Sequence, residues 1–101
     1  MRDLPTALGW INPDVSTALD WDRASVCRLA RKLGYMLEWF PDDTVLDPVC
    51  YIAAADVGMV IAPTPNHFDA LILNRLMHMV SVEIVRPRAS FDRWFGLGNW
   101  A

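Results

Sequence analysis

The sequence lacks the short motifs that most often reveal an activity. Its five glycines stand singly, at positions 9, 34, 58, 96 and 98, so no glycine-rich phosphate loop is present. Its two cysteines, Cys27 and Cys50, form neither a CxxC pair nor a cysteine–histidine pattern of metal-ligand spacing. No paired catalytic carboxylates stand out either. These absences favour a non-enzymatic protein that needs no metal and no cofactor.

Basic charge is also scarce. The chain has 9 lysines and arginines against 12 aspartates and glutamates, a formal net charge of −3. A sequence-independent nucleic-acid binder needs a basic excess, so nucleic acid is not an expected partner. The N-terminus has no apolar stretch behind a basic head, and the longest apolar runs are too short to span a bilayer. We therefore expect a cytoplasmic protein without membrane contact, with both cysteines as buried free thiols.

Apolar residues, in contrast, are plentiful: they make up 53% of the 101 residues. That length and composition predict one domain over residues 1–101 with a substantial core. Strand-like runs alternate with helical ones along it. Four runs are short and apolar enough to be strands, at residues 7–12, 35–40, 58–62 and 80–85.

Helices are predicted between and after these strands. Over 20–33, Val26, Leu29, Ala30 and Leu33 have helical spacing, with Asp20 as the expected cap and Gly34 as the stop. Asp47-Pro48 predicts a second helix that runs to about Ala55. A third follows Asn66, and a last turn or two begins at Ser90. The buried face expected for the third helix is Phe68, Leu71, Ile72, Leu76 and Met79.

This alternation predicts an α/β fold of three layers, with a short parallel sheet and helices on both faces, as in flavodoxin-like proteins. The run 58–62 is the most apolar and so the most central, whereas 35–40 carries Glu38 and 80–85 alternates like an edge strand. We therefore expect a four-stranded sheet with the order 2-1-3-4.

Several short motifs resemble the N-terminal catalytic domain of the serine recombinases, the resolvase and invertase family. They are Gly9-Trp10-Ile11 followed by Val15-Ser16, and a helix that ends Leu33-Gly34-Tyr35. The apolar run 59–62 and the leucine-rich helix after it also match, so the similarity spans residues 7–85. The resemblance implies a resolvase-like fold.

The departures from that family concern its catalytic residues. Only Ser16 could be the nucleophile, and an ungapped alignment places Asp14 there instead. The arginine of the first motif is replaced by Asn12 or Asp14, and 63–69 lacks the family's phosphate-binding arginines. Without them, charge on a scissile phosphate is not neutralised. No DNA-binding domain is expected to follow. The resemblance thus implies a degenerate relative that does not recombine DNA.

In an open parallel sheet, ligands bind at the carboxyl ends of the strands, where the strand order reverses. With the predicted order, this point lies between the first and third strands. There Asn12, Asp14 and Ser16 would face Thr64, Asn66 and His67. Asp14 or Ser16 with His67 could form a catalytic pair, or the group could hold a polar ligand. Ordinary turn and capping chemistry explains the same residues, and we keep both interpretations open.

Two further groups could bind a partner. Arg86 and Arg88 follow the last strand and could meet a phosphate or a carboxylate. Trp94, Phe95 and Trp100 gather at the C-terminus within an aromatic tail, 90–101, and aromatic clusters are enriched at interfaces. We therefore expect an interaction or regulatory domain that forms a homodimer or binds a protein partner. The alternative is a small hydrolase-type enzyme, or a nucleotide- or phosphate-binding module, that uses the mouth between strands 1 and 3.

Overall fold

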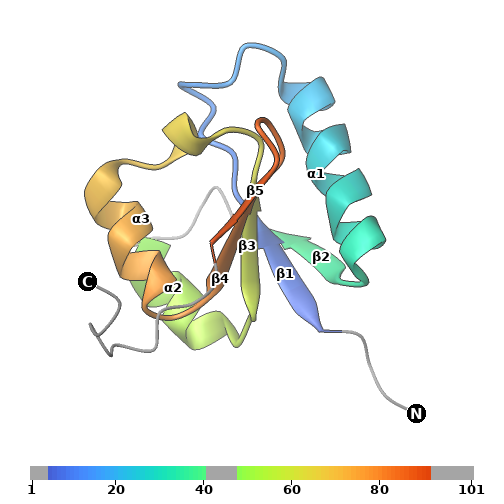
Figure 1. Ribbon diagram of the computed structural model, residues 1–101. Coiled ribbons are helices and arrows are strands. Elements are labelled where there is room, and N and C mark those ends of the chain that lie inside the picture. The colour runs from blue at the N-terminus through green and yellow to red at the C-terminus, as the bar shows by residue number, and fades with distance from the viewer. Residues whose placement is uncertain (1–4, 41–47, 92–101) are drawn as a thin grey trace.

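The computed structural model describes residues 5–40 and 48–91. They form a central sheet covered by helices, as Figure 1 shows. In chain order the elements are β1 (Thr6–Gly9), α1 (Leu19–Leu33), β2 (Met36–Trp39), α2 (Pro48–Ala55), β3 (Met59–Ala62), the short 3₁₀ helix η1 (Pro65–His67), α3 (Ala70–Met77), β4 (Ser81–Ile84) and β5 (Ala89–Phe91).

The sheet is mostly parallel and has the strand order β2-β1-β3-β4-β5. The pairs β1–β2, β1–β3 and β3–β4 are parallel, and β5 is antiparallel to β4. The predicted α/β class with a parallel sheet is confirmed, but the predicted number of four strands is wrong. The fifth strand makes β4 an internal strand, where an edge strand was expected.

The chain turns back after β4, and its pairing with β5 brings two partners to a buried charge. Glu83 in β4 is only 6% exposed. Its Oε1 accepts a hydrogen bond from the Ser90 hydroxyl at 2.6 Å and lies 2.6 Å from Nη1 of Arg88. The helix expected from Ser90 is therefore wrong for Ser90 and Phe91, which belong to β5. Residues 92–101, including Trp94, Phe95 and Trp100, lie outside the described residues.

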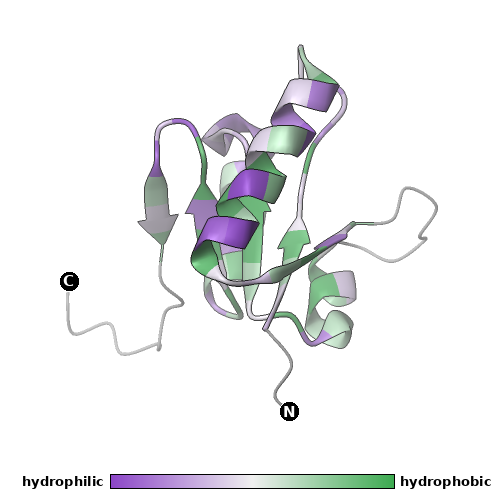
Figure 2. Ribbon diagram, turned by 90° about the vertical axis from the view of Figure 1, so that its right-hand side faces the viewer, coloured by the Kyte–Doolittle hydropathy of each residue, from purple (hydrophilic) through white to green (hydrophobic). Residues whose placement is uncertain are grey.

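Helices cover both faces of the sheet, with α1 on one face and α2 and α3 on the other (Figures 1 and 2). Under α1, Val26, Leu29 and Ala30 pack with Ala7, Met59 and Ile61 of the strands. The opposite core contains Leu8, Ile52, Val60, Leu76 and Val82, among others. Every residue of β3 is buried, as expected for a central strand.

Helix α1 ends as predicted but begins differently. Gly34 has φ +83°, a left-handed conformation in which a glycine readily ends a helix. At the start, Asp20 lies inside the first turn and does not cap it. The capping position is Ala18, which has no side chain able to accept a hydrogen bond from the helix. The first turn of α1 thus carries no side-chain cap.

Helix α3 begins at Ala70, capped by Asp69, whose Oδ1 accepts from the Ile72 N–H at 2.8 Å. The predicted buried face is wrong at Leu71, which is 77% exposed, whereas Leu76 is fully buried. The two leucines are five positions apart, which places them about 140° apart around the helix. Phe68 is buried, but it precedes the helix.

The cysteines lie in helices α1 and α2, as expected, and are not joined in a disulfide. Cys27 is half-buried and Cys50 is exposed, so the prediction that both thiols are buried is wrong. Helix α2 begins at Pro48 and ends at Ala55, as predicted, while its expected cap, Asp47, falls outside the described residues. Among the described helices, none is long and apolar enough to cross a membrane.

Candidate functional site

A cavity of about 320 Å³ opens at the carboxyl ends of β1 and β3. The order of the sheet explains its place: β1 continues into α1 on one face, whereas β3 continues towards α3 on the other, so the two loops diverge there. Its walls come from the β1–α1 loop, the start of α1, the region of η1 and the segment after β4. The lining residues are Val15, Ser16, Thr17, Ala18, Trp21, Asp22, Thr64, Asn66, His67 and Arg86.

The buried carboxylate of Asp22 organises one side of this cavity. Its Oδ2 accepts a hydrogen bond from the Ser16 hydroxyl at 2.6 Å, and its Oδ1 lies 2.5 Å from Nη2 of Arg86. Nη1 of Arg86 also donates to the Ser25 hydroxyl at 3.2 Å, and that hydroxyl donates to the backbone of α1. The network ties the β1–α1 loop and the segment after β4 to the first turns of α1.

The protonation of Asp22 is set by opposing effects. Burial raises the pKa of its carboxyl, but the hydrogen bonds from Ser16 and Arg86, with the charge of Arg86, outweigh burial and hold the pKa below its usual range. Asp22 is thus an ionised carboxylate at neutral pH. A carboxylate of low pKa is a weak proton acceptor, so it leaves the Ser16 hydroxyl unactivated.

His67 forms the opposite side of the cavity and is only 4% exposed. Its Nδ1 accepts a hydrogen bond from the backbone N–H of Asn12 at 2.8 Å, so the neutral ring carries its proton on Nε2. The Trp10 indole N–H donates to the His67 carbonyl at 3.2 Å and fixes the same segment. Within the described residues, no hydrogen bond reaches Nε2 and no buried side-chain nitrogen lacks a partner. Nε2 is therefore not fully buried, and His67 lines the cavity.

Burial lowers the pKa of His67, and the charge of Arg86 adds to this effect, while the Asp22 carboxylate partly offsets it. His67 is therefore a neutral imidazole at pH 7. It presents an N–H donor from Nε2, not a positive charge.

The predicted site residues divide into two groups. Ser16, Thr64, Asn66, His67 and Arg86 line the cavity. Asn12 supports it from behind through its N–H, and the Thr64 hydroxyl is hydrogen-bonded to the side-chain oxygen of Asn66.

Two other predicted residues do not line this cavity. Asp14 is exposed, with its N–H bonded to Oδ1 of Asn12, and Arg88 is paired with Glu83. In the described part of the chain, no hydrogen bond joins His67 to Asp14 or Ser16, and no group of three potential metal ligands occurs.

Asp22, Ser25 and Trp21 belong to the site but were not predicted from the sequence. A signal for Asp22 was present: it lies four residues before Val26 and seven before Leu29, on the buried face of α1. A carboxylate on a buried face needs a cation. The sequence offered no means of identifying Arg86, 64 positions away, as that cation.

No protein-family model, no curated protein and no solved structure matches this chain. Nothing therefore identifies a relationship to the serine recombinases, and that resemblance stays a prediction.

The buried neutral His67 makes a prediction about stability and pH. Because its pKa is lower in the folded than in the unfolded chain, the unfolded chain binds more protons just below pH 6.5. The contribution of His67 to the free energy of unfolding should be at its maximum above about pH 7.5. It should fall as the pH drops through 6.5, by up to about 1.4 kcal/mol per pH unit. Denaturant unfolding at pH 5–8 measures this slope.

His67→Asn is the matched variant, because its side-chain oxygen can still accept the Asn12 N–H while the side chain no longer titrates. The slope between pH 7.5 and 5.5 should flatten in this variant. An unchanged slope would show that another group causes the pH dependence.

Proposed function

We propose that this chain is a non-catalytic regulatory domain that binds the phosphate group of a small molecule in the cavity between the ends of β1 and β3. The observation that carries the proposal is that Arg86 and His67, from separate segments, both line this one cavity. Arg86 retains several N–H groups for a ligand, and His67 retains the one on Nε2.

The donors favour an anion. The guanidinium of Arg86 has five N–H groups, of which the contacts with Asp22 and Ser25 use two, and its side chain is 41% exposed. His67 adds the N–H on Nε2. The uncapped first turn of α1 lies beside them and supplies the positive end of the helix dipole. Asp22, the only carboxylate among the described lining residues, is already neutralised by Arg86.

The same contacts argue against catalysis. The Ser16 hydroxyl donates to Asp22, whose low pKa makes it a poor base. The Nδ1 atom of His67 already accepts a hydrogen bond from the Asn12 N–H. A serine nucleophile needs a base within hydrogen-bond reach. Binding without turnover is the function that this arrangement supports best.

A regulatory domain also needs something to regulate. We propose that the chain acts in the cytosol as a homodimer or with a protein partner, through apolar and aromatic surface. The support is compositional, since Trp94, Phe95 and Trp100 lie outside the described residues, together with the 58% exposed Trp21 at the cavity. Light scattering with and without phosphate measures this part, and a monomer in both conditions would contradict it.

Isothermal titration with inorganic phosphate and with a nucleoside 5′-monophosphate tests the site. Arg86→Lys keeps the charge but loses the planar fork, so the affinity for both probes should fall about tenfold. Arg88→Lys is the matched control, because this second arginine after β4 has a similarly exposed side chain (45%) but pairs with Glu83. Its affinity should stay within about twofold of the parent chain. No binding of either probe, or equal losses in the two variants, would contradict the proposal.

A further inference from the structure

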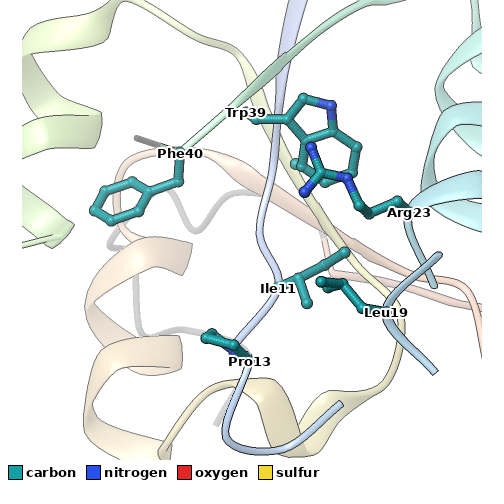
Figure 3. A pocket seen from close by; sticks show the side chains of 7 residues that line it. Ile11, Pro13, Leu19, Arg23, Trp39 and Phe40 are labelled. Atoms are coloured by element: carbon teal, nitrogen blue, oxygen red, sulfur yellow. The ribbon is translucent and has the colours of Figure 1, made fainter. Parts of the chain in front are cut away.

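A second cavity, also of about 320 Å³, lies at the carboxyl ends of β1 and β2. Among the described residues, it shares no lining residue with the cavity between the ends of β1 and β3, which we call the Arg86 cavity. Figure 3 shows the side chains of Ile11 and Leu19 pointing toward one another, with the Arg23 guanidinium lying across the ring of Trp39. Pro13 and Phe40 complete the apolar lining.

The absence of a side chain at Gly9 makes room for this arrangement. A Cβ at position 9 would lie 2.5 Å from two ring carbons of Trp39, well inside van der Waals contact. The indole therefore lies against the bare backbone of β1 and forms a flat apolar wall. Leu19, the first residue of α1, is 44% exposed at the same cavity, so apolar surface is left facing solvent there.

Among the described residues that line this cavity, Arg23 is the only charged one. Its guanidinium carbon is 4.8 Å from the centre of the Trp39 ring, a cation–π distance. Arg86 and Arg88 are each paired with a carboxylate, but no carboxylate of the described residues pairs with Arg23. The tryptophan ring orients the guanidinium without neutralising its positive charge.

We propose that this cavity binds a small amphiphilic carboxylate, with the acid on Arg23 and an apolar body against Ile11, Leu19 and Trp39. A planar guanidinium binds a carboxylate through two parallel hydrogen bonds. The volume of about 320 Å³ suits a body the size of one aromatic ring or a short branched chain. The uncapped first turn of α1, which begins at Leu19, adds its positive dipole end.

The test is an NMR titration of the full chain with phenylacetate, followed at the Trp39 indole N–H. Phenylacetamide, which has the same shape without the charge, is the comparison ligand. Phenylacetate should bind with a dissociation constant of about 1 mM, and phenylacetamide at least about tenfold more weakly.

Two arginine variants distinguish the effect of the Arg23 charge from the effect of removing any positive charge from α1. Arg23→Gln should abolish the preference for phenylacetate over phenylacetamide. Arg28→Gln should keep it, although Arg28 also stacks on a tryptophan from α1, with its guanidinium carbon 5.7 Å from the centre of the Trp21 ring. Equal affinity for the two ligands in the parent chain would overturn the proposal. So would an unchanged preference in Arg23→Gln, or shifts confined to the Arg86 cavity.

Discussion

Arg86→Met should lower the free energy of unfolding by about 2 kcal/mol, whereas Asp22→Asn should lower it by about 1 kcal/mol. The side chain of Asp22 is 7% exposed and that of Arg86 is 41% exposed. Removal of the arginine leaves a buried carboxylate with the Ser16 hydroxyl as its remaining side-chain partner. Removal of the carboxylate charge leaves a guanidinium that water can reach. Because Arg86 is half-exposed, the loss of unfolding free energy in Arg86→Met should stay below the 3–5 kcal/mol typical of a fully buried pair.

Denaturant unfolding at pH 7 measures both variants. The dependence on pH provides an internal control, because the low pKa of folded Asp22 gives stability that is present above about pH 4 and lost as the carboxyl is protonated. The cost of Arg86→Met should therefore shrink below about pH 4. A greater cost for Asp22→Asn than for Arg86→Met at pH 7 would contradict this account of the ion pair.

Leu76→Ala should cost about 3 kcal/mol, and Leu71→Ala on the same helix less than about 0.5 kcal/mol. Leu76 is fully buried against the core that contains Leu8, Val60 and Val82, so its truncation leaves a cavity. Leu71 is 77% exposed and has little apolar contact to lose. Both variants make the same chemical change in α3, so helix propensity cancels between them.

Thermal and denaturant unfolding of the two leucine variants, with helix content followed by circular dichroism, measures the difference. Equal losses of stability would mean that α3 packs on the sheet through a different face, one that includes Leu71. The pair therefore tests the rotation of α3 about its axis.

The larger features of the fold follow from local patterns. The spacing of Val26, Leu29 and Ala30 predicted the buried face of α1, and the apolar run 58–62 predicted a central strand. Such patterns are sufficient when one face of an element is uniformly apolar. The same kind of pattern failed for α3. Apolar residues occur all around this helix, so their spacing does not show which of them face the sheet.

Features that depend on distant residues could not be predicted. Residues 89–91 form a strand in which Ser90 contacts Glu83, with Arg88 just before it, and the local sequence after Ser90 does not indicate this distant partner. The position of the candidate site was predictable, since ligands gather where the order of parallel strands reverses. The contact of Asp22 with Arg86 was not, because it depends on how α1 lies against the segment that follows β4.

In the part of the chain that the structure describes, the antiparallel β5 gives the sheet two unlike borders. At one border, β5 has three residues and joins β4 through the Glu83–Ser90 hydrogen bond. At the other, β2 has four residues, and the exposed Glu38 stands in its middle. Short strands and an exposed charge discourage a neighbouring chain from adding its own strand. Within the described residues, both borders of the sheet thus discourage the addition of a strand from another copy, despite a composition that is 53% apolar.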